Sequence, residues 1–211
     1  MKKLILTSVF VLSTFYLTAQ QLGTFTDTRD NKTYKTVTIG SQTWLAENLS
    51  FNATSGTKCY QNNPEMCKKY GVLYTWDAAL SACPAGWHLP SDIEWQTMVE
   101  FLGGEEIAGG KLKATGTWTA PTEGATNDSG IWTAPNEGAT NESGFNALPA
   151  GCYFGTEDEY DTVGINAYFW TSTPNGTTEA KSRYLYNDSA EVGVFLDAKT
   201  LGWSVRCVKT N

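Results

Sequence analysis

Five cysteines are the residues of this chain whose chemistry depends most directly on their spacing. Zinc sites use close cysteine pairs such as C-x-x-C, and the sequence has none. Disulfides are the expected alternative if the chain reaches an oxidising compartment. We predict one bridge between Cys59 and Cys67, which flank a short polar loop, and another between Cys83 and Cys207. Cys152 is then left over, as a buried thiol, which its apolar neighbours favour, or as a link between two chains.

The single histidine, His88, lies between Trp87 and Leu89, just before a predicted helix. As a general base it would need a nucleophile beside it, and the sequence suggests none. We therefore favour a packing role at the entry of the helix.

Two polar loops carry oxygen-rich residues that suit calcium. Calcium prefers hard oxygen ligands on irregular loops, which Asn127, Asp128, Asn141 and Glu142 could supply. The alternative is that these residues only form turns, as Asn, Asp, Ser and Gly often do. The acidic run 157–161 could join such a site, but a solvated hairpin tip is the more ordinary interpretation.

These loops belong to an internal duplication, in which residues 118–130 recur as residues 132–144. Each copy begins with a tryptophan, Trp118 or Trp132, in a segment without apolar periodicity. Exposed indoles on long loops would suit ligand binding, because they offer a large contact area at low entropic cost. Alternatively, both rings fold back over a small core. The tryptophans on periodic apolar faces are expected in the core: Trp44, Trp76, Trp95, Trp170 and Trp203; Trp87 is ambiguous.

Local patterns predict the elements that must position these residues. Residues 37–44 read as a hairpin, and residues 75–82 and 91–102 as helices. Ser91 and Glu94 form a capping box at the start of the second helix. From residue 105 onward no helical period is visible, and short strands are predicted at 167–173, 192–196 and 203–208. The expected class is α+β, with helices in the first half and strands and long loops in the second.

The N-terminal residues 1–19 have the layout of a secretory signal peptide, with Lys2 and Lys3 before a short apolar run and a plausible cleavage site after Ala19. A single domain over 20–211 would remain, in the periplasm, at the cell surface or outside the cell, without a membrane span. Loss of two lysines would change the formal net charge from −7 to −9. An acidic protein does not attract polyphosphate, so nucleic-acid binding is disfavoured.

Several stretches together resemble the Fibrobacter succinogenes major paralogous domain family, known as FISUMP. They follow the order of the family over nearly the whole predicted mature chain: Ile39–Leu49 (IGSQTWLAENL), Gly71–Ala79 (GVLYTWDAA), Cys83–Trp95 (CPAGWHLPSDIEW), Ser143–Gly151 (SGFNALPAG), Tyr168–Thr173 (YFWTST) and Ser204–Lys209 (SVRCVK). The resemblance implies a bacterial surface or secreted protein and names no biochemical activity. Two departures are the duplication and Cys152, where the family more often has an aromatic residue.

A more distant resemblance links His88–Trp95, Trp170–Ser172 and Trp203–Cys207 to formylglycine-generating-enzyme-like domains. That superfamily has a C-type-lectin-like fold, which implies two helices packed on a small, twisted, mostly antiparallel sheet with long loops. The copper-binding cysteine pair of those enzymes has no counterpart, since residues 174–206 contain no cysteine. A single histidine also cannot build the histidine-rich iron site of ergothioneine-type relatives. The resemblance therefore does not carry catalysis with it.

The sequence thus favours a non-catalytic binding module, with Trp118 and Trp132 contacting a glycan or protein ligand and no cofactor beyond the calcium alternative. A purely structural cell-envelope protein is the second hypothesis. An enzyme of an unrecognised type is the third, and no pair of titratable residues has a spacing that indicates it.

Overall fold

The computed structural model describes residues 21–118, 131–155 and 159–210. Its helices are the 3₁₀-helix η1 (Tyr60–Asn62) and the α-helices α1 (Pro64–Tyr70), α2 (Trp76–Leu80), α3 (Asp92–Phe101) and α4 (Glu105–Leu112). Its strands up to the duplication are β1 (Gln21–Thr26), β2 (Thr33–Ile39), β3 (Gln42–Leu45), β4 (Thr57–Lys58), β5 (Leu73–Tyr74), β6 (Trp87–His88), β7 (Thr117–Trp118) and β8 (Trp132–Thr133). The later strands are β9 (Cys152–Tyr153), β10 (Tyr160–Asp161), β11 (Asn166–Asn175), β12 (Glu179–Tyr186), β13 (Gly193–Ala198), β14 (Trp203–Ser204) and β15 (Val208–Lys209).

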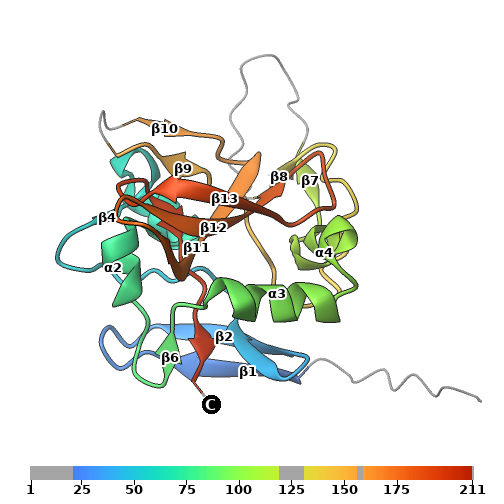
Figure 1. The fold of residues 1–211 in the computed structure, drawn as a ribbon, viewed down its shortest axis with the longest axis horizontal. Helices are drawn as coiled ribbons and strands as arrows, with labels where there is room; N and C mark the ends of the chain where they lie inside the picture. The colour runs from blue at the N-terminus through green and yellow to red at the C-terminus, as the bar shows by residue number, and fades with distance from the viewer. Residues whose placement is uncertain (1–20, 119–130, 156–158, 211) are drawn as a thin grey trace, which may run out of the picture.

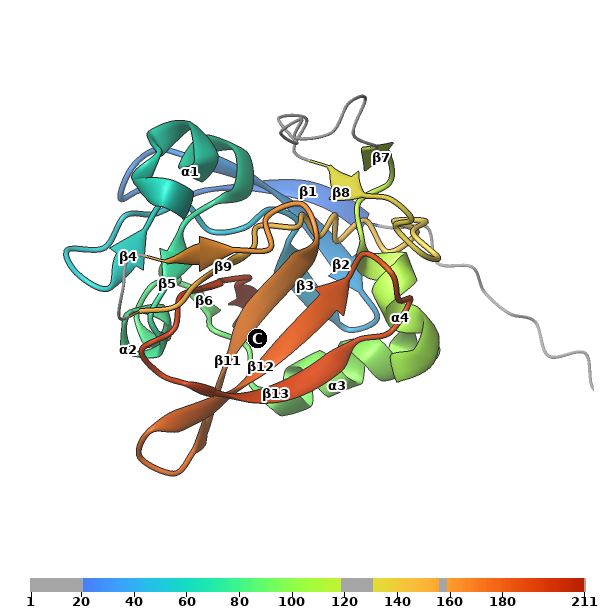
Figure 2. The ribbon, with the colours of Figure 1, turned by 90° about the horizontal axis from the view of Figure 1, so that it is seen from above.

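Two large sheets organise the described residues. One has five strands in the order β1-β2-β3-β15-β6, and the other has six in the order β13-β12-β11-β14-β5-β4. Helix α3 lies between them in the view of Figure 1. Seen from above, β11, β12 and β13 run side by side, and both pairs are antiparallel (Figure 2). Two small sheets, β9 with β10 and β7 with β8, complete the strand pairing.

The predicted C-type-lectin-like arrangement is wrong. In place of two helices on one small sheet, the described residues form four sheets and four short α-helices, although an α+β class remains roughly consistent. The physical reason is that β15, late in the chain, pairs with β3 and β6 and joins them, with β1 and β2, into a second large sheet.

The local predictions in the first half of the chain are confirmed. The hairpin is β2 and β3, and the two helices are α2 and α3. In the capping box of α3, Ser91 Oγ accepts from the amide of Glu94 at 3.2 Å, and Glu94 Oε2 accepts from the amide of Ser91 at 2.7 Å. Local hydrogen bonds of this kind do not depend on the rest of the fold, which is why the sequence predicts them.

The prediction that no helix follows residue 105 is wrong, because residues Glu105–Leu112 form α4. Its sequence, EEIAGGKL, contains two adjacent glycines and has little amphipathic pattern. The glycines let the helix backbone touch other segments: a Cβ at Gly109 would lie 2.2 Å from the Glu191 carbonyl oxygen, and one at Gly110 equally close to that of Gly138. Contacts distant in sequence therefore select a helix that intrinsic propensity disfavours.

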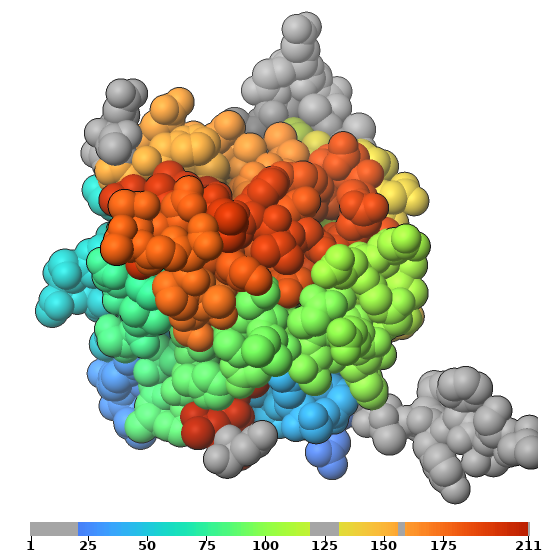
Figure 3. Space-filling model, in the orientation of Figure 1, coloured from blue at the N-terminus to red at the C-terminus, as the bar shows by residue number. Residues whose placement is uncertain are grey.

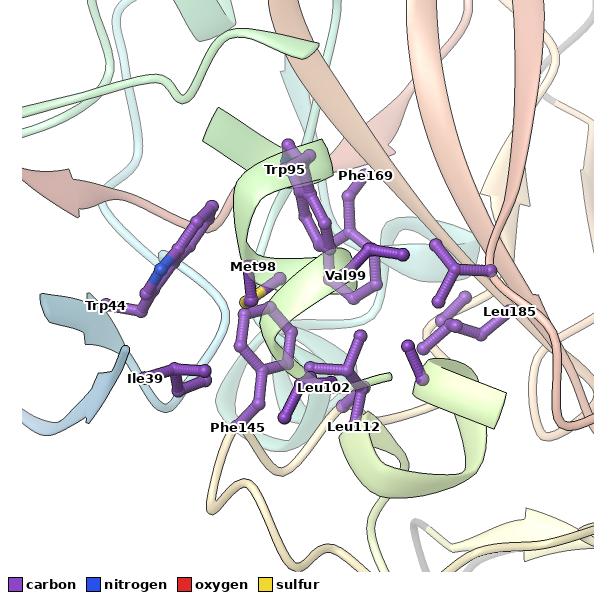
Figure 4. Packing of buried hydrophobic residues seen from close by; sticks show 14 of the residues in the cluster. Ile39, Trp44, Trp95, Met98, Val99, Leu102, Leu112, Phe145, Phe169 and Leu185 are labelled. Carbon is purple, nitrogen blue, oxygen red and sulfur yellow. The ribbon is translucent and has the colours of Figure 1, made fainter. Parts of the chain in front are cut away.

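The main core fills the space between the sheets and α3 (Figure 4). Trp95 of α3 is completely buried, and its ring centroid lies 5.2 Å from that of Trp44, 5.5 Å from Phe145 and 5.4 Å from Phe169. The other tryptophans predicted for the core, Trp76, Trp170 and Trp203, are also buried. The ambiguous Trp87 is buried too, against Phe25.

Both predicted disulfides are confirmed. Cys59 is bonded to Cys67, and Cys83 to Cys207. Cys152 is a free, buried thiol, as its apolar neighbours indicated. Burial raises the pKa of this thiol, despite hydrogen bonds with Thr162 and the backbone of Asp161 that lower it. Among the described helices, none is both long and apolar enough to cross a membrane.

Candidate functional site

The two tryptophans predicted to contact a ligand do not form an exposed pair. Trp132 on β8 is completely buried, and its Nε1 donates a hydrogen bond to the Ala147 carbonyl oxygen at 2.9 Å. Of the two alternatives for Trp132, its burial fits a ring that folds back over the core and not an indole exposed to a ligand. Trp118 is half-buried on β7, which pairs in parallel with β8. The second copy of the duplication therefore supplies a core residue, as that alternative expected.

Of the four candidate calcium ligands, Asn127 and Asp128 lie outside the described residues. Asn141 Oδ1 accepts from the Asn146 amide at 2.9 Å, and Glu142 forms an ion pair of 2.8 Å with Lys111. Within residues 21–118, 131–155 and 159–210, no group of three or more His, Cys, Asp or Glu residues is arranged to hold a metal ion. In the acidic run, residues 157 and 158 are also outside the described part, while Tyr160 and Asp161 form β10. Calcium binding stays a prediction.

His88 lies at the entry of α3, in agreement with its predicted packing role. Its Nε2 is 2.7 Å from Glu94 Oε1, and its Nδ1 is 3.1 Å from Thr210 Oγ1. Burial by itself would raise the pKa of Glu94, but the Ser91 amide and His88 outweigh it and lower this pKa. The imidazole thus links the C-terminal segment to the capping box of α3.

Lys113, directly after α4, is a buried cation beside Trp132. Its Nζ donates to the carbonyl oxygens of Tyr186 at 2.9 Å and Ser189 at 2.7 Å, and lies 5.4 Å from the Trp132 ring centroid. Burial lowers the pKa of Lys113 from 10.5 to about 8, although Glu137 and Asp188 act in the opposite direction. A folded-state pKa below the unfolded value means that the native state releases its proton first as the pH rises.

This shift predicts a pH dependence of stability. Below pH 8 the buried ammonium destabilises the fold, and between pH 8 and 10.5 the unfolded state binds more protons, so stability rises with pH. We expect the free energy of unfolding, relative to Lys113→Met, to rise by about 1 kcal/mol from pH 7 to pH 9. Urea denaturation at both values measures it, with Lys35→Met on the exposed side of β2 as the control. If the free energy of unfolding changed with pH equally in the wild type and in Lys113→Met, the lowered pKa of Lys113 would be contradicted.

A contiguous aromatic surface lies on one face of β11, β12 and β13. We call it the aromatic row, formed by Tyr168, Tyr184, Tyr186 and Phe195, with Trp203 of β14 at its inner end. Ring centroids are 4.1 Å apart for Phe195 and Tyr184, 4.6 Å for Tyr184 and Tyr186, 6.4 Å for Tyr186 and Tyr168, and 4.6 Å for Tyr168 and Trp203. Phe195 is 39% exposed, the three tyrosines are half-buried, and Trp203 is buried.

Strand register explains why these rings meet. Tyr168 is directly opposite Tyr184, and Tyr184 is directly opposite Gly193, so all three positions are on the same face. A Cβ at Gly193 would lie 1.8 Å from Tyr184 Cζ, so the Tyr184 ring occupies the space that a side chain would fill. Glycine at this position therefore lets the ring cross onto β13 and stack with Phe195.

Polar groups hold the inner end of the row. Asp197 Oδ2 accepts from Trp203 Nε1 at 3.0 Å and from Ser182 Oγ at 2.5 Å, and Asn166 Nδ2 donates to the Tyr168 hydroxyl at 2.9 Å. Burial raises the pKa of Asp197, although the bonds from Ser182 and Trp203 act against it. The rings are thus oriented by partners of their own, which limits the entropy they would lose on binding.

Strand β13 is the edge of the six-stranded sheet and carries exposed apolar side chains. Val194 is 37% exposed and Leu196 is 51% exposed, on either side of Phe195. In Figure 3 the orange and red surface comes from the C-terminal part of the chain, which contains β11, β12 and β13. An apolar edge strand of this kind is a natural place for a partner to bind, because no described strand pairs with its outer side.

A pocket of about 350 Å³ lies near the end of β13, and we call it the turn pocket. It is lined by residues from four separate segments: Gly56, Thr57, Lys58, Leu73, Thr75, Asp77, Tyr153, Gly155, Lys199 and Thr200. None of these was a predicted site residue, because no short stretch of sequence contains more than three of them. The aromatic row did leave a signal, since Tyr184 and Tyr186 alternate along a strand.

Comparisons with known proteins identify the family. The family model described as Fibrobacter succinogenes major domain matches residues 37–209, most of the chain. No curated protein and no solved structure matches. The more distant resemblance to formylglycine-generating-enzyme-like domains is therefore not confirmed. The match from β2 to β15 shows that this chain belongs to the Fibrobacter succinogenes major domain family.

Proposed function

We propose that this protein is an exported, non-catalytic module that binds a glycan on the aromatic row. The observation that carries the proposal is the contiguous set of rings from Phe195 to Trp203 on one sheet face, with Phe195 exposed and the three tyrosines half-buried. Aromatic side chains bury a large area at low entropic cost, and their apolar surfaces suit the C–H groups of a sugar ring. Asp197 and Asn166 add hydrogen-bonding groups beside the rings.

Export is supported by the layout of residues 1–19 and by the two disulfides, which form and persist in oxidising compartments. Whether the mature chain stays in the periplasm or reaches the cell surface does not affect the binding proposal.

The non-catalytic assignment is supported by how the single histidine is used. His88 connects the Thr210 hydroxyl to the Glu94 carboxylate, a set of groups that also occurs in hydrolases. Glu94, however, also accepts hydrogen bonds from the amide and hydroxyl of Ser91 at the start of α3. We therefore infer that Thr210, His88 and Glu94 connect the C-terminal segment to the start of α3.

A glycan array on the mature protein tests the proposal. We expect a positive glycan whose affinity falls about tenfold or more in Phe195→Ala and in Tyr184→Ala, a loss of at least about 1.4 kcal/mol. Phe101→Ala is the matched control, because Phe101 is a more exposed phenylalanine on α3, outside the row. Equal affinity of Phe195→Ala, Tyr184→Ala and the wild type would refute binding on the row.

The same array, run with calcium and with a chelator, tests the calcium prediction. Binding lost on chelation would support a calcium site that includes Asn127, Asp128, Asn141 and Glu142. Binding that is indifferent to chelation would leave the aromatic row as the proposed contact and remove calcium from it.

A structural cell-envelope protein is the second candidate. It is favoured by the burial of Trp132 and by the exposed apolar side chains of β13, an edge at which strands of other molecules can pair. A blank array would favour this candidate over a glycan-binding module.

A further inference from the structure

We infer that the turn pocket is a second binding site, separate from the aromatic row, and that it takes a single neutral sugar ring. The inference goes beyond the proposed function, because the pocket contains no residue of the row. It rests on the rigidity of the pocket walls, on the mixture of polar groups that face it, and on its size.

Regular backbone hydrogen bonds hold the walls together. Strands β4 and β5 pair through Thr57 with Tyr74 and Lys58 with Leu73. The Trp76 amide donates to the Lys199 carbonyl oxygen at 3.0 Å, which ties the turn after β13 to α2. A pocket built in this way is formed before a ligand arrives, so binding needs little reorganisation.

Two glycines bring the walls close to each other. Gly56 and Gly155 have φ values of +70° and +81°, in the left-handed region that favours glycine. A Cβ at Gly56 would lie 2.5 Å from Thr75 Oγ1, and one at Gly155 would lie 2.5 Å from the Thr200 carbonyl oxygen. Larger residues at either position would displace a pocket wall.

Polar groups of several kinds line the pocket. Within the described part of the chain, the hydroxyls of Thr75 and Thr200 and the carboxylate of Asp77 form no hydrogen bond with another residue, so a ligand can use them. Lys199 Nζ donates to the carbonyl oxygens of Gly176 at 3.2 Å and Thr177 at 3.1 Å. Its Nζ also lies 4.3 Å from the Trp76 ring centroid, so these contacts hold the ammonium in place and Lys199 contributes positive charge beside the pocket.

The apolar part of the lining is smaller. Leu73 and Tyr153 are largely buried, and Lys58 Nζ lies 5.4 Å from the Tyr153 ring centroid. The Tyr153 hydroxyl donates to the Gly155 carbonyl oxygen at 3.2 Å, which fixes the ring beside the second glycine.

This set of groups selects the chemical class of ligand. An anion would meet the Asp77 carboxylate, a cation would meet two lysines, and an apolar ligand would leave the polar groups without partners. A neutral polyhydroxyl compound can donate to Asp77 and exchange hydrogen bonds with the hydroxyls of Thr75 and Thr200. The volume is at the lower end of the roughly 300–1,000 Å³ of ligand pockets, which suits one sugar ring.

Nuclear magnetic resonance titration of the mature protein tests the inference. The probes are the methyl glycosides of glucose, galactose, mannose and N-acetylglucosamine, followed at the amides of Gly56, Gly155 and Thr200. We expect at least one to give saturable shifts with a Kd on the order of 1 mM. Thr200→Val and Asp77→Asn should weaken this binding about tenfold, since the first removes a hydroxyl and the second replaces a charged acceptor with a neutral amide, both with little change in shape.

Two controls separate this result from the proposed function. Thr24→Val makes the same change at an exposed position on β1, and Phe195→Ala alters only the aromatic row; both should bind the glycoside like the wild type. The inference is overturned if none of the four glycosides gives saturable shifts at these amides, or if Thr200→Val and Asp77→Asn bind as the wild type does. Loss of the shifts in Phe195→Ala would also overturn it, because the pocket would then not be a separate site.

Discussion

Replacing Asp92 with alanine is expected to lower the free energy of unfolding by roughly 3–5 kcal/mol. Asp92 begins α3 and forms ion pairs of 2.7 Å with Lys181 and 2.6 Å with Arg183, both on β12. The Arg183 side chain is only 2% exposed, so loss of the carboxylate leaves a nearly buried guanidinium without its main counter-charge. The remaining acceptors, Gln96 at 3.1 Å and Glu105 at 3.8 Å, compensate only in part.

Urea denaturation of Asp92→Ala measures this loss, and Glu65→Ala is its matched control. Glu65 pairs with Lys68 at 2.6 Å, but both side chains are highly exposed, so its removal should cost less than about 1 kcal/mol. If Asp92→Ala lowered the free energy of unfolding no more than Glu65→Ala does, the ion pairs of Asp92 with β12 would not stabilise the packing of α3 on the sheet.

The stability contributed by the ion pairs of Asp92 with Lys181 and Arg183 should depend on pH in the acidic range. Burial alone would raise the pKa of Asp92, but the hydrogen bond to Lys181 and the charge of Arg183 outweigh it, and the pKa is lowered. The stabilisation is therefore present above the unfolded value of about 3.9 and is lost as the pH falls through the folded pKa. The difference in the free energy of unfolding between the wild type and Asp92→Ala should accordingly become smaller at acidic pH.

Removing the disulfide between Cys83 and Cys207 is expected to cost more than removing the one between Cys59 and Cys67. The bonded cysteines are 124 residues apart in the first case and 8 in the second. By the loss of unfolded-chain entropy, the long closure contributes roughly 4–5 kcal/mol and the short one roughly 2–3 kcal/mol. The long bridge also connects the segment after α2 to Cys207, the residue before β15. Strand β15 lies between β3 and β6 in the five-stranded sheet.

Paired alanine variants measure the difference. Cys83→Ala with Cys207→Ala and Cys59→Ala with Cys67→Ala each remove one bridge without adding a polar group to the interior. Both are compared with the wild type by urea denaturation, and the long-bridge variant should have the lower midpoint. Equal midpoints, or a lower midpoint for the short-bridge variant, would show that the folded-state contacts of the cysteines outweigh loop length.

Features that depend on neighbouring residues are predictable from the sequence alone. The capping box of Ser91 and Glu94 and the apolar stripe of α3 predict that helix, because both arise within a few residues of each other. The alternation around Trp44 predicts the hairpin of β2 and β3 for the same reason. The family match also follows from sequence, because it depends on motifs in order along the chain.

The folded structure was needed to show which polar segments become buried and which strands share a face. The sequence left Trp132 either exposed or folded back, and its indole is buried in the core, where the Ala147 carbonyl oxygen accepts its hydrogen bond. Phe195 joins Tyr184 and Tyr168 through the register of three strands, and the turn pocket combines four segments. Contacts of this kind depend on how whole strands and helices pair, which local composition does not encode. The candidate site could therefore be identified only from the folded structure.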